Sequence, residues 1–187
     1  LSPLVDTLLF SPSGVFYDDT LFTRWLVQLL NRLGVHADFS SFACLMQREA
    51  LRAAYVGESD FWPAMRRMLG EIGLSRVQIA EVELAGQARA RQCDEQIRLL
   101  PGVATTLSRL SASGVRMALV ANSVEAASPM SQRLERLGLS DLFHDVIVSR
   151  DLGHVLPEST MFEATLERLG RPAPVVAFVS NCPMELE

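Results

Sequence analysis

The chain has 187 residues, 49% of them hydrophobic, and carries a net charge of −5 at pH 7. This length suffices for one good core with a smaller inserted subdomain, and the acidic balance argues against nucleic-acid binding, which usually requires a basic face. No apolar run approaches the roughly 20 residues that span a bilayer, and no signal-peptide pattern opens the chain, so we expect a cytoplasmic protein without a membrane partner.

The first half of the chain combines one short strand with a block of helices. An apolar segment from Leu4 to Phe10 is stopped by Ser-Pro-Ser-Gly, which is typical of a buried strand. From Thr20 onward the apolar residues recur with the helical period, and Gly34 ends this first stripe. Three more helical stretches follow without a strand between them, around residues 39–56, 60–72 and 76–92. We therefore expect a four-helix subdomain.

After Leu100-Pro101-Gly102 helices and strands alternate. The expected strands cover residues 115–120, 146–148 and 175–179, and the expected helices cover residues 103–111, 129–137 and 159–169. Alternation with short links predicts an α/β fold with a doubly wound, parallel, Rossmann-like sheet and right-handed crossovers. The first strand must join this sheet across the helical block. We therefore expect a core of residues 1–19 and 96–187, with the four helices inserted at residues 20–95.

Four segments are expected to meet at one edge of this sheet, because parallel strands end on the same side and ligands bind there. These segments follow the four strands. They cover residues 11–14, 121–123, 149–156 and 180–182.

Two residue types narrow the chemistry further. All 17 basic residues are arginines, so any mechanism that requires a lysine ammonium is excluded. The three cysteines lie far apart without CxxC spacing, which predicts neither a disulfide framework nor a zinc site, and we expect all three to be buried small hydrophobes: Cys44, Cys93 and Cys182. Because the chain starts without Met and stops at Glu187, we expect a fragment of a longer protein.

The layout resembles the haloacid dehalogenase-like (HAD-like) hydrolase superfamily, in the subgroup with a helical cap inserted after the first strand. The resemblance covers essentially the whole chain and lies in five segments of matching order and spacing. They are Phe10-Ser11-Pro12-Ser13-Gly14-Val15, Leu100-Pro101-Gly102-Val103, Val120-Ala121-Asn122-Ser123, Gly153-His154-Val155-Leu156-Pro157 and Phe178-Val179-Ser180-Asn181 with Glu185.

The resemblance implies a phosphoryl-transfer or dehalogenation site whose charged residues are absent from this chain. In the family, one Asp is the nucleophile, a second Asp two residues later is the general acid and base, and a hydroxyl and a Lys stabilise the developing charge. A further acid holds Mg²⁺. The corresponding residues here are Ser11, Ser13, Ala121, Leu156 and Asn181. Of the family's acids at this edge, only Glu185 remains.

Five substitutions in one site favour the loss of catalysis over a retuned enzyme. Carboxylates that share a site repel one another unless a cation lies between them, so their joint replacement by neutral residues gives a site that is stable without metal. The resemblance implies Mg²⁺ as the cofactor, but its ligands are largely missing, and we expect no cofactor. We expect a catalytically inactive member that binds a protein partner or a small anionic ligand.

The expected ligand contacts lie at the carboxyl ends of the strands, where hydroxyl, amide and backbone N–H groups could bind an anion without a metal. They are Ser11, Ser13, Gly14, Asn122, Ser123 and Asn181. An outermost strand whose backbone groups are not paired along one side also makes a homodimer possible.

Alternatives with an active site remain open. One is a divergent HAD-like phosphatase or dehalogenase that uses unrecognised residues. Another is a serine nucleophile at Ser11 with His154 as its base and Asp151 orienting that base, although motif-like spacing alone often misleads and a neutral turn is favoured. Cys182 as a reactive thiol is likewise less favoured than an inert, buried cysteine.

Overall fold

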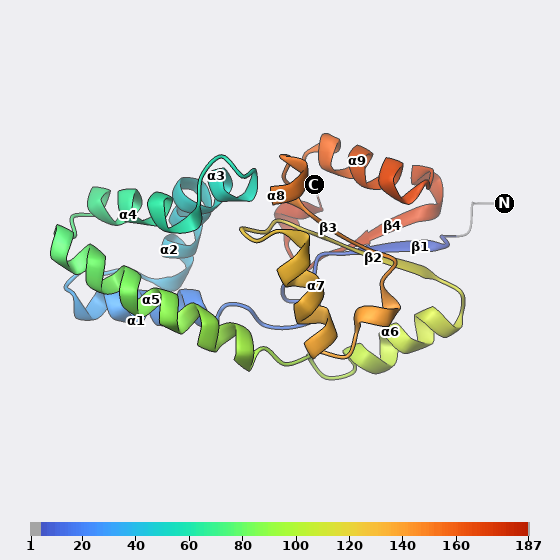
Figure 1. Ribbon diagram of the computed structural model, residues 1–187, viewed down its shortest axis with the longest axis horizontal. Coiled ribbons are helices and arrows are strands. Elements are labelled where there is room, and N and C mark those ends of the chain that lie inside the picture. Colours follow the sequence, from blue (N-terminus) through green and yellow to red (C-terminus); the bar gives the residue numbers. More distant parts are fainter. Residues whose placement is uncertain (1–4, 187) are drawn as a thin grey trace. The chain divides into compact units, whose positions relative to one another are not determined.

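A computed structural model describes residues 5–186 and divides the chain into two compact units (Figure 1). The core unit comprises Leu1–Asp18 and Arg98–Glu187, and the helical unit comprises Asp19–Ile97. These limits differ by one or two residues from the boundaries expected from the sequence.

The core unit is built on a four-stranded sheet in which every pairing is parallel. Its strands are β1 (Thr7–Phe10), β2 (Arg116–Ala121), β3 (Asp145–Val148) and β4 (Val176–Val179), in the order β3-β2-β1-β4. The expected α/β fold with a parallel sheet is thus confirmed, with strand ends shifted by one residue after β1. Leu4, the expected start of the first strand, lies outside the described residues.

Helices cover both faces of this sheet. The connecting helices are α6 (Val103–Ala112), α7 (Ala127–Arg136) and α9 (Ser159–Leu169). In Figure 1, α9 lies on one side of the sheet and α6 and α7 lie on the other, as in a doubly wound fold. A short helix that the sequence did not indicate, α8 (Ser149–Leu152), follows β3 directly.

The alternating directions of strand side chains explain how one sheet supports two apolar layers. Leu9 packs in a buried cluster with strand residues of β2 and β3 and with Met161 of α9. Its neighbour Phe10 contacts different partners, the rings of Phe16 and Phe143, at centroid distances of 5.3 and 6.3 Å. Each strand is therefore apolar on both faces, which accounts for the nearly unbroken hydrophobic runs in the sequence.

The helical unit contains more segments than the sequence suggested. It comprises α1 (Leu21–Arg32), α2 (Phe39–Met46), α3 (Arg52–Tyr55), α4 (Phe61–Glu71) and α5 (Arg76–Gln96). The single helix expected over residues 39–56 is α2 and α3 joined by a π-helical turn, Gln47–Leu51. A π-turn accommodates an extra residue without ending the helix, which explains why the hydrophobic pattern continued through it.

Capping residues fix where two of these helices begin. Ser75 accepts a hydrogen bond from the Gln78 N–H and the Gln78 side chain accepts one from the Ser75 N–H, a reciprocal capping box at α5. Asp38 accepts a hydrogen bond from the Ser41 N–H at the start of α2, and this bond lowers the pKa of the Asp38 carboxyl. Asp60 precedes α4 but makes no side-chain cap.

The cysteines differ from the expectation at two positions. Cys93 is buried, but Cys182 is half-buried and Cys44 is exposed on α2, so the prediction that all three are buried was wrong. None of the described helices is long and apolar enough to cross a membrane.

Candidate functional site

The order of the strands places the candidate site at the carboxyl ends of β1 and β4. The chain passes from β1 to β2 and then to β3 on one side, and it returns to place β4 on the other side of β1. Ligands in open parallel sheets bind where the order reverses in this way. All four segments expected at this edge follow the strands there.

The turn after β1 is tight, and its backbone groups bond to one another and to β4. The buried Ser11 donates its N–H to the Val179 carbonyl of β4 at 2.9 Å, and Gly14 donates to the Tyr17 carbonyl at 2.8 Å. Ser13 forms an isolated β-bridge with Tyr17. The N–H groups of Val15 and Phe16 both donate to the Pro12 carbonyl. The backbone donors that we expected to offer to an anion are thus largely used inside the turn.

Asn181 lies directly against Gly14. Gly14 has a φ of +66°, and a Cβ atom at this residue would overlap the Asn181 Nδ2 atom. Glycine is required here both by the left-handed backbone and by the close approach of the amide. The first and fourth motif segments therefore meet, and the carboxamide occupies the space above the turn.

Asn122 ties two strand ends together. Its Oδ1 accepts from the Leu156 N–H at 2.8 Å and its Nδ2 donates to the Leu156 carbonyl at 3.1 Å. Both polar atoms of this amide are therefore engaged by one backbone residue across the sheet edge. As a ligand contact Asn122 stays a prediction, and a ligand would have to compete with this pair of bonds.

Ser123 is also part of a local network. Its N–H donates to the buried Ser149 Oγ at 3.0 Å, while its own hydroxyl donates to the Glu125 carbonyl and accepts from the Glu125 N–H. Ala121, which the sequence predicts at the position of the family's hydroxyl, is buried at the end of β2. These contacts join the ends of β2 and β3.

Leu156 belongs to the hydrophobic core. Its side chain is buried, and it packs in the same cluster as Leu9, Val120 and Met161. A lysine at this position would have to extend its ammonium group out of these surroundings. Leaving the ammonium group buried without water would cost a large amount of free energy. The apolar residue thus suits the local packing.

The remaining acid of the fourth segment is bound by a serine. Ser180 donates to the Glu185 Oε2 atom at 2.6 Å and accepts from the Cys182 N–H at 3.0 Å. Glu185 lies in a short 3-10 turn, Pro183–Glu185, just beyond β4. Its carboxylate is therefore already stabilised by a short hydrogen bond within its own segment.

The serine-nucleophile alternative finds no support in the position of Asp151. The Asp151 Oδ2 atom accepts from the Ala127 N–H at 3.0 Å, at the first residue of α7. This contact stabilises the helix start and assigns the carboxylate a structural role. His154 is half-buried on the loop that follows α8.

The donor set at this edge does not fit the magnesium ion that the resemblance implies. Mg²⁺ is usually held through one or two carboxylates, whereas Ser11 and Asn181 offer a hydroxyl and an amide, and Glu185 is bonded to Ser180. Among residues 5–186, no group of three or more His, Cys, Asp or Glu side chains is placed to hold a metal ion.

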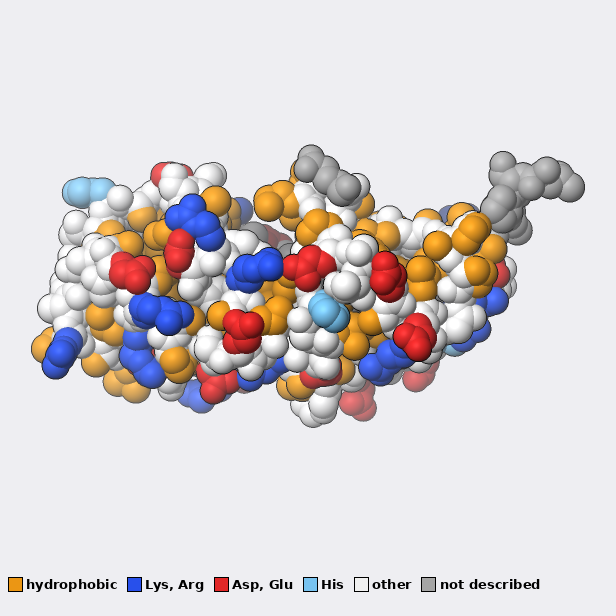
Figure 2. All heavy atoms as spheres, turned by 90° about the horizontal axis from the view of Figure 1, so that it is seen from above, with side chains coloured by type: hydrophobic (Ala, Val, Ile, Leu, Met, Phe, Trp, Pro, Cys, Tyr) orange, Lys and Arg blue, Asp and Glu red, His pale blue; other side chains and the backbone are white. Residues whose placement is uncertain are grey.

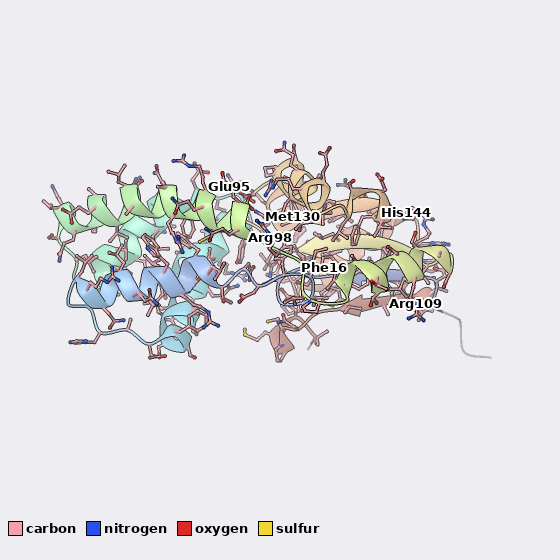
Figure 3. All side chains as sticks on the ribbon, turned by 90° about the horizontal axis from the view of Figure 1, so that it is seen from below. Phe16, Glu95, Arg98, Arg109, Met130 and His144 are labelled. Atoms are coloured by element: carbon pink, nitrogen blue, oxygen red, sulfur yellow. The ribbon has the colours of Figure 1, made fainter. Side chains whose placement is uncertain are left out.

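Three contributors to this edge were not singled out from the sequence. Ser149 and Ser180 hold the segments after β3 and β4 through their hydroxyls. Tyr17 donates from its phenol to the Met130 Sδ atom at 3.6 Å, which connects the turn after β1 to α7. Met130 and Phe16, the neighbour of Tyr17, are labelled in Figure 3. The only signal for the serines was their place directly after a strand.

An ion pair with two hydrogen bonds lies at the other end of the sheet. Arg168 of α9 donates two hydrogen bonds to the Asp145 carboxylate, at 2.6 and 2.8 Å, where β3 begins. These bonds raise the pKa of the Arg168 guanidinium. In Figure 2, acidic and basic side chains are interspersed over the face that it shows.

Comparison with known proteins shows to which protein family the sequence is similar. A family model of haloacid dehalogenase-like hydrolases matches residues 14–186. The chain is 33% identical over 87 residues to a ribulose-1,5-bisphosphate 5-phosphatase of Halopiger xanaduensis, over 46% of this chain and 36% of that protein. It is 30% identical over 74 residues to a glyceraldehyde 3-phosphate phosphatase of Methanothermobacter thermautotrophicus, over 40% of this chain and 32% of that protein. The matches thus span about a third of each curated relative.

The fold is similar to solved structures at low sequence identity. One is the L-2-haloacid dehalogenase of Xanthobacter autotrophicus, with a TM-score of 0.62 and 21% identity, over 98% of this chain and 72% of that one. Another is a HAD-superfamily hydrolase of Geobacter sulfurreducens, with a TM-score of 0.66 and 14% identity, over 97% and 80% of the two chains.

Proposed function

Because this chain belongs to the haloacid dehalogenase-like hydrolases, we propose that it is a member that has lost the family's reaction and acts by binding. The observation that carries the proposal is the state of the five positions at the sheet edge. They hold Ser11, Ser13, Ala121, Leu156 and Asn181, which are all neutral, and the Leu156 side chain is built into the hydrophobic core.

The size of the expected loss supports the proposal. Removing a nucleophile or one electrostatic stabiliser usually lowers the rate by about a hundredfold to ten-thousandfold or more, and such losses overlap within one site. Here the nucleophile, the acid-base group, the lysine and the metal acid are replaced together. A hydroxyl such as Ser11 is a weak nucleophile unless an adjacent base activates it, and an amide such as Asn181 lacks the negative charge with which a carboxylate binds Mg²⁺.

For the ligand we propose a small anion or a protein partner that contacts the carboxyl ends of β1 and β4. The hydroxyls of Ser11 and Ser13 and the carboxamide of the exposed residue Asn181 belong to the segments that follow β1 and β4, between which the strand order reverses. Inorganic phosphate is a suitable first probe. Calorimetric titration of the wild type beside Asn181→Ala tests whether this edge binds it, since only an edge-bound anion loses affinity in the variant.

The reaction itself is tested by a phosphatase and dehalogenase screen with Mg²⁺. Three proteins are compared: the wild type, Ser11→Ala, and a variant that combines Ser11→Asp, Ser13→Asp, Leu156→Lys and Asn181→Asp. We expect the wild type and Ser11→Ala to be equally inactive. Turnover by the wild type that Ser11→Ala abolishes would show that the reaction has been retained.

A second candidate is a divergent phosphatase, and the curated relatives favour it because both are named as phosphatases. Because residue 11 is a serine, such an enzyme would need a nucleophile other than the carboxylate that the family uses at this position. The same screen distinguishes the two functions. Phosphate-ester turnover that persists in Ser11→Ala and co-purifies with the protein would point to an unrecognised active site.

A further inference from the structure

Helix α5 presents apolar side chains to solvent. Val77 and Leu84 are 70% and 75% exposed, although both are large aliphatic residues. Together with Arg76, Ala80 and Glu81 they line a shallow depression on the helix surface. The other side of the helix is already packed into the helical unit through the buried residues Val82, Gly86 and Cys93.

The exposed side of α5 has the spacing of a helix-pairing seam. Exposed residues recur along it at alternating intervals of four and three positions, as in coiled coils. In chain order they are Val77, Glu81, Leu84, Ala88, Arg91 and Glu95. The last of these, labelled in Figure 3, lies near the C-terminal end of the helix. The middle of the seam is apolar and charged residues of opposite sign flank it.

This charge order is complementary to itself when a second copy runs in the opposite direction. With the two helices centred on residue 86, Leu84 of one copy faces Ala88 of the other. Glu81, five positions before the centre, then faces Arg91, five positions after it, and twofold symmetry repeats both contacts. A parallel arrangement would instead place like charges together. The pattern therefore favours an antiparallel pair.

We propose that α5 is a self-association surface, on which a second copy of this chain packs its own α5 in the antiparallel direction. The pairing is independent of the proposed loss of catalysis. A helix of this length is about 31 Å long, and one helix per copy forms an interface at the small end of the known range. We therefore expect a weak dimer, with a dissociation constant of about 10–500 μM.

Sedimentation equilibrium of the full chain between about 10 and 500 μM protein tests the proposal. Leu84→Glu should weaken the dimer at least about tenfold, because it places charge at the apolar centre. The matched control is Leu186→Glu, since Leu186 is 57% exposed in the core unit and receives the same change. Circular dichroism establishes that each variant is folded.

A charge exchange tests the antiparallel direction. Glu81→Arg places two arginines opposite each other twice in the dimer and should weaken it about tenfold at low salt. Adding Arg91→Glu restores opposite charges and should return the affinity to about the wild-type value. A chain that stays monomeric over the whole range, a dimer weakened only by Leu186→Glu, or a double variant that is not rescued would overturn the proposal.

Discussion

Replacing Asn122 with alanine should destabilise the core unit strongly, because this side chain alone pairs with both backbone groups of Leu156. The Oδ1 and Nδ2 atoms make hydrogen bonds of 2.8 and 3.1 Å to that residue. Each bond contributes about 0.5–1.5 kcal/mol net, and leaving buried backbone groups without a partner costs about 1–3 kcal/mol more. Since Leu156 is buried, we expect Asn122→Ala to lower the free energy of unfolding by about 2–4 kcal/mol.

Asn31 is a matched control for this experiment. Its side chain makes a comparable set of bonds to backbone groups, donating to the Val27 and Ala37 carbonyls and accepting from the Ala37 N–H. Asn31 is exposed, however, so water can replace these bonds when it is removed. We expect Asn31→Ala to cost at most about 1 kcal/mol.

Urea unfolding followed by circular dichroism gives the two free energies, and hydrogen exchange at the Leu156 amide gives the local effect. For a protein of this size the loss corresponds to a fall in Tm of about 5–15 °C for Asn122→Ala. Both tryptophans, Trp25 and Trp62, lie in the helical unit, so their fluorescence separates its transition from that of the core unit. Equal losses for the two asparagine variants would refute the role of burial.

Two further predictions concern a close contact and a pH dependence. Gly14→Ala should destabilise the protein by about 0.5–1.5 kcal/mol more than Gly102→Ala, because both glycines have positive φ but only the first would drive a Cβ into Asn181. When both substitutions are made in an Asn181→Ala background, this extra loss of stability should vanish in urea unfolding. An extra loss that persists there would contradict the contact. Asp38 has a lowered pKa, so its cap stabilises the helical unit above the ordinary carboxyl pKa of about 3.9 and is lost as the pH falls through the lower folded value. The stability difference between the wild type and Asp38→Ala, followed by tryptophan fluorescence, should therefore shrink between about pH 5 and pH 2, and a difference that grows on acidification would contradict this cap.

The sequence predicted the elements whose patterns are long and regular. The α9 limits, Ser159 and Leu169, coincide with the prediction, because apolar residues recur there with the helical period and Gly170 ends the pattern. The parallel sheet followed from the alternation of helices and strands. The short helix α8 was not predicted, since four residues give no period, and neither was the π-turn in the helical unit, where the apolar pattern continues.

At the candidate site the sequence predicted which segments meet but not how their side chains are used. The approach of Asn181 to Gly14 follows from the strand order, yet its closeness depends on the rotamer of one amide. Leu156 was expected as a neutral replacement at the edge, whereas the structure places its side chain in the core cluster. Asn122 was expected to offer donors to a ligand, and its bonds to the Leu156 backbone join segments 34 residues apart. Such contacts depend on tertiary packing, which residue spacing alone does not specify.

The most direct test of the central claim is the ratio of kcat/KM between the wild type and Ser11→Ala, measured with Mg²⁺ on phosphate esters and haloacids. Ser11 is predicted to hold the position of the family's nucleophile, so any retained reaction through this position must depend on it. If the site has been neutralised as a unit, the two proteins have the same background rate and the ratio is about one. A ratio of about a hundred or more would contradict the account, because it would show that the serine takes part in turnover.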